Sequence, residues 1–144
     1  MSDEAGVLAA STQFYAALNA MLSGDASGMA DIWSQTATVT TMHPIGGRQV
    51  GWADVKASWD AVAKIAGGGE VVVEERIIQV AGDMAYELGI EQGHVMIAGH
   101  EVPKIDDRVT NVYRREGGTW KIVHHHTDIS EAMLEVLAEF QEGE

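Results

Sequence analysis

The sequence predicts an α+β fold in which a strongly curved antiparallel sheet wraps around three N-terminal helices as an open cone. Apolar residues recur at helical spacing up to residue 65, strand-like alternation follows over 70–128, and another amphipathic segment begins at Ser130. Helices that are segregated from an antiparallel sheet are typical of this class. A chain of 144 residues with 46% apolar residues can form one core, so we expect a single domain over 1–144.

The expected helices lie towards the two ends of the chain. Apolar residues at steps of three and four predict a first helix over 4–23, and Gly24 ends it. Asp25 is suited to cap a short second helix that extends through Trp33. A third helix is expected over 51–65, with an apolar stripe of Trp52, Val55, Trp59, Val62 and Ile65.

The expected strands form an early hairpin and a four-stranded meander. The early hairpin has a Thr/Val-rich strand over 36–42 and a turn over 44–47. The meander has strands over 70–80 and 84–95, followed by two strands within 106–128. Gly117 and Gly118 tolerate positive φ and predict the turn between these last two strands. Asp106 and Asp107 are expected on a solvated edge.

Composition excludes several classes of function. No apolar run approaches the ~20 residues of a membrane-spanning helix, so we expect no membrane insertion. The net charge of −13 disfavours binding to nucleic acid and to anionic membranes. The absence of cysteine excludes thiolate nucleophiles and cysteine-based zinc sites. The acidic start at Met1–Glu4 is not a secretory signal, and we expect a cytoplasmic protein.

Two motifs resemble a known superfamily. One combines Trp33, Ala37-Thr38-Val39, His43-Pro44-Ile45-Gly46 and Gly51, and the other combines Asn111-Val112-Tyr113 with the run from Gly118 to His126. The first is similar to ketosteroid isomerases, and the second resembles the association domain of calcium/calmodulin-dependent kinase II. Both belong to the nuclear transport factor two-like superfamily, which also includes SnoaL-like polyketide cyclases. The resemblance covers nearly the whole chain in the order of its elements.

The resemblance implies roles for individual residues. The isomerases have an aspartate as general base where this chain has His43, and an imidazole can also move a proton near neutral pH. Their oxyanion-stabilising acid corresponds to Asn111, whose amide can donate a hydrogen bond. Their first-helix tyrosine corresponds to Ala17, with Tyr15 nearby, so steroid isomerisation itself is not expected.

The resemblance also orients the last two strands. If Asn111 faces the cavity, alternation places every second residue of both strands beside it, including His125. His124 and His126 then lie on the outer face of the sheet, where this superfamily forms dimers. The ligand-binding residues are therefore expected to be Tyr15, Trp33, Trp59, Tyr86, Val109, Tyr113, Val123 and Thr127.

The leading prediction is a protein that binds a small apolar or carbonyl-containing molecule in an apolar cavity. The chemistry implied is isomerisation, cyclisation or hydration by proton transfer without a cofactor. His43 would act as acid and base, while Asn111 and either His125 or Tyr15 would polarise the ligand.

Two alternatives stay open. One is a non-catalytic ligand-binding or association module that forms a homodimer through the sheet face, with Arg108 in an interfacial ion pair. The other is a metal site, since His124, His126 and Asp128 share one face of a strand. The same His-x-His spacing serves packing at the dimer face in this superfamily, so we predict no metal.

Overall fold

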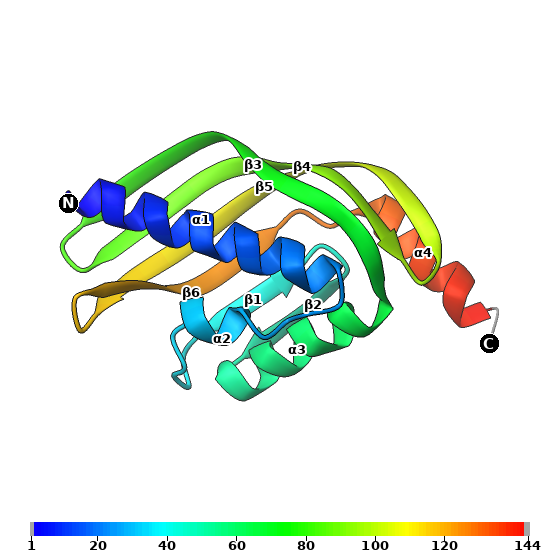
Figure 1. The fold of residues 1–144 in the computed structure, drawn as a ribbon, viewed down its shortest axis with the longest axis horizontal. Coiled ribbons are helices and arrows are strands. Elements are labelled where there is room, and N and C mark those ends of the chain that lie inside the picture. The colour runs from blue at the N-terminus through cyan, green and yellow to red at the C-terminus, as the bar shows by residue number, and fades with distance from the viewer. Residues whose placement is uncertain (1, 143–144) are drawn as a thin grey trace.

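The computed structural model describes residues 2–142, so positions 1, 143 and 144 of the predicted domain lie outside the described residues. In Figure 1, α1 runs along the sheet, α2 and α3 lie beside β1 and β2, and α4 lies at the opposite end from the N-terminus. The elements are, in chain order, α1 (Asp3–Leu22), α2 (Met29–Ile32), β1 (Thr40–His43), β2 (Gly46–Val50), α3 (Trp52–Ile65), β3 (Ala66–Ala81), β4 (Met84–Ile97), β5 (His100–Glu116), β6 (Thr119–Thr127) and α4 (Glu131–Glu142).

The sheet has six strands in the order β2-β1-β6-β5-β4-β3. The expected four-stranded antiparallel meander is β3 to β6, and the expected early hairpin is β1 and β2. β1 pairs with β6 in parallel, so the sheet is mixed at this one junction. The predicted α+β class, with a curved sheet wrapped around the N-terminal helices and a helix at the C-terminal end, is confirmed.

The long β3–β4 hairpin bends where its two strands approach each other most closely. Gly69 has a φ of +126°, and a Cβ at this position would overlap the carbonyl oxygen of His94 on β4. The pairing of β4 with β5 shifts register between Gly93 and Val95. Glycine and a register shift both allow a strand to bend sharply. The bend carries the C-terminal end of β4 towards α4, as Figure 1 shows.

Aromatic rings fill the space between α1, α3 and the sheet. Phe14 is fully buried, with its ring centroid 6.0 Å from that of Trp59 and 6.3 Å from that of Trp33. The imidazole of His125 on β6 lies 5.0 Å from the Phe14 ring. Buried aromatic contacts of this kind stabilise a core beyond their area alone. They also anchor one wall of the cavity described below.

No helix in residues 2–142 is long and apolar enough to cross a membrane.

Candidate functional site

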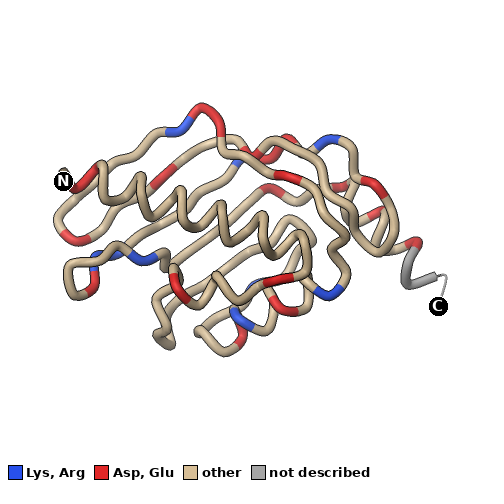
Figure 2. The backbone as a smooth tube through the Cα atoms, in the orientation of Figure 1, with Lys and Arg blue, Asp and Glu red and all other residues tan. Residues whose placement is uncertain are grey.

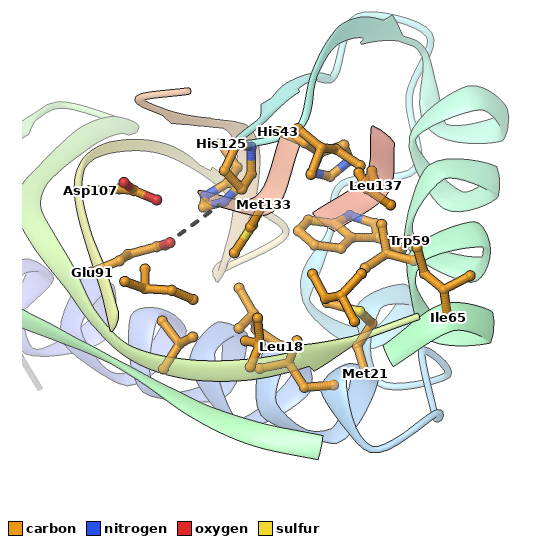
Figure 3. Close-up of a pocket in the computed structure, with 18 residues that line it drawn as sticks. Leu18, Met21, His43, Trp59, Ile65, Glu91, Asp107, His125, Met133 and Leu137 are labelled. Carbon is orange, nitrogen blue, oxygen red and sulfur yellow. Dashed lines mark ion pairs between the residues drawn. The ribbon is translucent and has the colours of Figure 1, made fainter. Parts of the chain in front are cut away.

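A cavity lies between the inner face of the sheet and the helices α1, α3 and α4 (Figure 3). Its free volume is about 60 Å³. Most of its lining is aliphatic or aromatic, and no lysine or arginine is among the described residues that line it. The lining residues are Leu18, Met21, Leu22, His43, Pro44, Ile45, Trp59, Val62, Ile65, Val71, Glu91, Val95, Ile97, Ile105, Asp107, His125, Met133 and Leu137.

Two carboxyl groups face this apolar space. Glu91 on β4 and Asp107 on β5 are direct cross-strand partners, and both are buried. Burial raises the pKa of Glu91 to about 7; a hydrogen bond from Tyr15 opposes the rise, and the charges of Asp107 and Glu87 add to it. Burial, with the charges of Asp128 and Asp106, also raises the pKa of Asp107. Like charges opposite each other in a low-dielectric site favour protonation.

Two uncharged imidazoles face the carboxyl groups. His125 is 1% exposed, and burial together with the neighbouring His43 lowers its pKa well below the ordinary value. Its Nε2 lies 3.8 Å from Glu91 Oε2, the contact drawn as a dashed line in Figure 3. Its Nδ1 lies 2.6 Å from the Oδ1 of Asn111. His125 therefore presents Nε2 to the cavity.

His43 lines the same cavity from the end of β1. Burial lowers its pKa to about 4, so its ring is neutral at physiological pH. Its Nε2 lies 2.8 Å from Ser58 Oγ, and that hydroxyl donates to the carbonyl of Val55 at 2.6 Å. Because the hydroxyl hydrogen is already donated, Nε2 of His43 must donate to Ser58. The imidazole of His43 is thus held by α3 at its Nε2.

A family model described as a SnoaL-like domain matches residues 7–130. The chain belongs to the SnoaL-like family. The predicted superfamily is thereby confirmed. No curated protein matches this SnoaL-like chain.

Solved structures similar to this SnoaL-like domain differ in what they are named for. A putative dehydratase of the nuclear transport factor two-like family from Streptomyces avermitilis has a TM-score of 0.76 and 24% identity, over 89% of this chain and 96% of that one. A putative calcium/calmodulin-dependent protein kinase type II association domain from Thiobacillus denitrificans has a TM-score of 0.67 and 31% identity, over 85% and 94%. The hub of that kinase from S. rosetta has a TM-score of 0.70 and 20% identity, over 90% and 98%.

The structure brings part of the predicted set together. His43, His125 and Trp59 line the cavity. Tyr15 reaches it through the hydrogen bond from its hydroxyl to Glu91, at 2.9 Å. Asn111 contacts His125, but both hydrogens of its amide point elsewhere, towards Glu87 at 2.9 Å and Tyr15 at 3.1 Å. The Asn111 amide is therefore not free to polarise a ligand.

Other predicted ligand-binding residues lie elsewhere in the SnoaL-like fold. Tyr86 was expected in the cavity, but it lies on the outer face of β4 with 44% of its surface exposed. Val123 was also expected there, but a register shift between Val112 and Tyr113 makes it the extra residue of a bulge, and Ile122 is the buried residue instead. The remaining ones are buried but do not line the cavity: Trp33, Val109, Tyr113 and Thr127.

Sequence reasoning missed the acidic residues on the inner face of β4, because the apolar residues of this strand lie on its outer face. Glu87 and Glu91 are buried, whereas Tyr86 and Leu88 point outwards. Asp107, expected on a solvated edge, is 8% exposed, and its Oδ2 has no hydrogen-bond partner within residues 2–142. The signal that could have found Glu91 is its position four residues after Glu87, on the same face of one strand.

The outer histidines are not arranged for a metal. Asp128 is held by the guanidinium of Arg108, at 2.9 Å for each of two hydrogen bonds. Arg108 thus pairs within the chain. Over the described residues, no group of three or more histidine or acidic side chains is placed to hold a metal ion.

Proposed function

We propose that this SnoaL-like protein binds a small, uncharged, carbonyl- or hydroxyl-bearing molecule and catalyses proton transfer on it without a cofactor. One observation carries the proposal. A neutral imidazole, that of His125, lies 3.8 Å from the Glu91 carboxyl, whose pKa is raised to about 7, in an apolar cavity. Groups whose environments hold them in opposite protonation roles near neutral pH are suited to act as base and acid.

The contacts assign one role to each residue. Nε2 of His125 takes a proton from carbon next to a carbonyl, and the carboxyl of Glu91 gives a proton to the ligand oxygen. Tyr15, which donates to Glu91 at 2.9 Å, holds that carboxyl in place. The indole nitrogen of Trp59 has no partner among the described residues and is available to a ligand oxygen. Relative to the sequence-based hypothesis, we assign the role of base to His125 in place of His43, because the Nε2 of His125 lies 3.8 Å from the carboxyl of Glu91.

The cavity sets the size of the ligand. About 60 Å³ is well below the roughly 150 Å³ of an apolar cavity that holds benzene. A ring-sized ligand therefore requires Met133 and Leu137 of α4, which line the cavity, to move aside. The absence of lysine and arginine from the described lining disfavours an anionic ligand, since nothing there offsets its charge.

The test is hydrogen–deuterium exchange at carbon. Small ketones and β-hydroxy ketones are incubated with the protein in D₂O and followed by proton NMR for exchange next to the carbonyl and for loss of water. His125→Gln is expected to lower the rate by about 100-fold or more, since general-base catalysis contributes roughly 10²–10⁴. The matched control is His100→Gln, an exposed histidine at the start of β5. Wild-type rates equal to buffer across the panel, or an unchanged His125→Gln rate, would contradict the proposal.

A second role, association, is favoured by the outer face of the sheet. Five large apolar side chains on β3 and β4 are exposed there, and we name them the outer-face patch: Val72, Ile77, Met84, Tyr86 and Leu88. Ile77 and Leu88 are cross-strand partners, and His126 lines the same groove. Contiguous exposed apolar surface marks interaction sites. The resemblance to a kinase association domain at 31% identity points the same way, so we propose a homodimer through this face.

Leu88→Lys is expected to convert the dimer to a monomer in light scattering coupled to size-exclusion chromatography, because two lysines would be buried without partners at a two-fold interface. Ile129→Lys is the control, since Ile129 is 52% exposed and lies outside the patch. A wild-type protein that stays monomeric at high concentration would contradict the homodimer.

A further inference from the structure

Three buried polar residues form a row across three neighbouring strands. Glu87 on β4 pairs directly with Asn111 on β5, and Asn111 pairs directly with His125 on β6. Each is at most 1% exposed. Directly opposed residues have side chains on the same face of a sheet, about 5 Å apart. The row therefore connects Glu87, which does not line the cavity, to the imidazole that does.

The carboxylate of Glu87 is surrounded by donors. Its Oε2 accepts from Ser11 Oγ and Arg76 Nε, each at 2.7 Å. Its Oε1 accepts from Asn111 Nδ2 and from the Tyr113 hydroxyl, each at 2.9 Å. An ionised carboxylate only accepts hydrogen bonds, so the side of the Asn111 amide that faces it must be the nitrogen.

The orientation of that amide decides where His125 carries its proton. With the nitrogen towards Glu87, the oxygen of Asn111 faces His125 Nδ1 at 2.6 Å. A carbonyl oxygen only accepts, so Nδ1 must donate. A neutral imidazole has one N–H, and its Nε2 is left with the lone pair that points towards Glu91.

We propose that Glu87 is a positioning residue that fixes the tautomer of His125 through the amide of Asn111. The tautomer follows from the hydrogen-bond row alone; its value for catalysis rests on the proposed function. Glu87 thereby determines, from outside the cavity, that the nitrogen facing a ligand is the basic one.

Glu87→Gln makes the proposal testable because it replaces one acceptor by a donor. The guanidinium of Arg76 only donates, so the new side-chain oxygen turns towards Arg76 and the new nitrogen towards Asn111. Asn111 then flips to present its oxygen to the new nitrogen and to the Tyr15 hydroxyl, which accepts from Nδ2 in the wild type and would donate instead. The nitrogen of Asn111 then faces His125. The proton of His125 is expected to move from Nδ1 to Nε2.

The measurement is nitrogen-15 NMR of histidine-labelled protein at neutral pH, which distinguishes the two tautomers of a neutral imidazole. The His125 signals are those missing from the His125→Gln spectrum. Wild type is expected to show the Nδ1–H tautomer, and Glu87→Gln the Nε2–H tautomer. Tyr113→Phe, which removes one donor to Glu87 and leaves the carboxylate, is expected to keep Nδ1–H.

Two results would overturn the proposal: the Nε2–H tautomer in wild type, or the Nδ1–H tautomer retained in Glu87→Gln. If Glu87→Gln does not fold, Asn111→Thr takes its place. A threonine hydroxyl has one hydrogen, which the Glu87 carboxylate takes, so its oxygen accepts from Nδ1 of His125. A single Nδ1–H form therefore supports the relay, and an Nε2–H form refutes it. Carbon–hydrogen exchange is measured on the same samples. A correct tautomer without any exchange refutes the proposed function alone, and exchange with the wrong tautomer refutes the positioning role alone.

Discussion

Replacing Glu91 with glutamine is expected to stabilise the folded protein by about 3 kcal/mol above pH 7, and to change its stability very little near pH 4. Glutamine has the same shape, carries no charge and still offers an oxygen to the hydroxyl of Tyr15. Stabilisation on removal of an acidic group is unusual. It is expected here because the carboxyl is buried opposite Asp107.

The sign follows from where the proton is bound. The pKa of Glu91 is raised from 4.5 to about 7 in the folded state. Below pH 4.5 both the folded and the unfolded chain hold the proton of Glu91, so its ionisation does not change the free energy of unfolding. Between the two values the unfolded chain releases its proton while the folded chain keeps it, and folding becomes less favourable as pH rises. Above pH 7 the full cost is present, at about 1.4 kcal/mol for each unit of pKa.

Urea unfolding at pH 4, 6 and 8 measures the effect, as the difference in free energy of unfolding between variant and wild type. Glu74→Gln is the control, since Glu74 is exposed on β3 and surface substitutions change stability by about 0.5 kcal/mol or less. A difference that does not grow with pH would show that the pKa of Glu91 is the same in the folded and the unfolded protein, and would contradict the prediction.

The sequence predicted that His43 and His125 line the cavity, but it did not predict that Glu91 and Asp107 do. The resemblance to the superfamily predicted that His125 lies beside Asn111. The register set by the Gly117-Gly118 turn alone would pair Asn111 with His124, and the bulge at Val123 shifts the register by one residue so that Asn111 pairs with His125. On β4, the alternation of apolar and polar residues does not identify the inner face, because the outer face is also apolar. Tyr86 and its even-numbered neighbours match the pattern of a core face while they lie outside.

The burial of Glu87 depends on partners that are distant in sequence. Ser11 is 76 positions away and Arg76 is 11 positions away, and neither forms a local motif with it. A buried carboxylate is stable only when its donors are in place, and that requires the fold to be known. The bulge at Val123 is hidden for a similar reason, since the run Ile122-Val123 carries no glycine or proline to mark it.

Replacing Arg76 with methionine is expected to destabilise the protein by about 3–5 kcal/mol, because the carboxylate of Glu87 would stay buried without a cation. Glu87 is fully buried, and Arg76 is the cation that contacts it, at 2.7 Å. Denaturant unfolding at neutral pH measures the loss. Arg108→Met is the matched control, since the Arg108 side chain is 82% exposed and exposed ion pairs contribute little to stability. Equal costs for the two variants would contradict the argument.

The double variant Arg76→Met/Glu87→Gln separates charge from shape. If the cost of Arg76→Met comes from an uncompensated charge, the neutral glutamine removes most of it, and the double variant is more stable than Arg76→Met alone. Glutamine has one oxygen and cannot accept from all three remaining donors, Ser11, Asn111 and Tyr113, as the carboxylate did, so full wild-type stability is not expected. Apolar residues could fill this space at similar stability, but they would not orient Asn111. The ion pair is therefore better explained by the orientation it imposes on His125 than by the stability it adds.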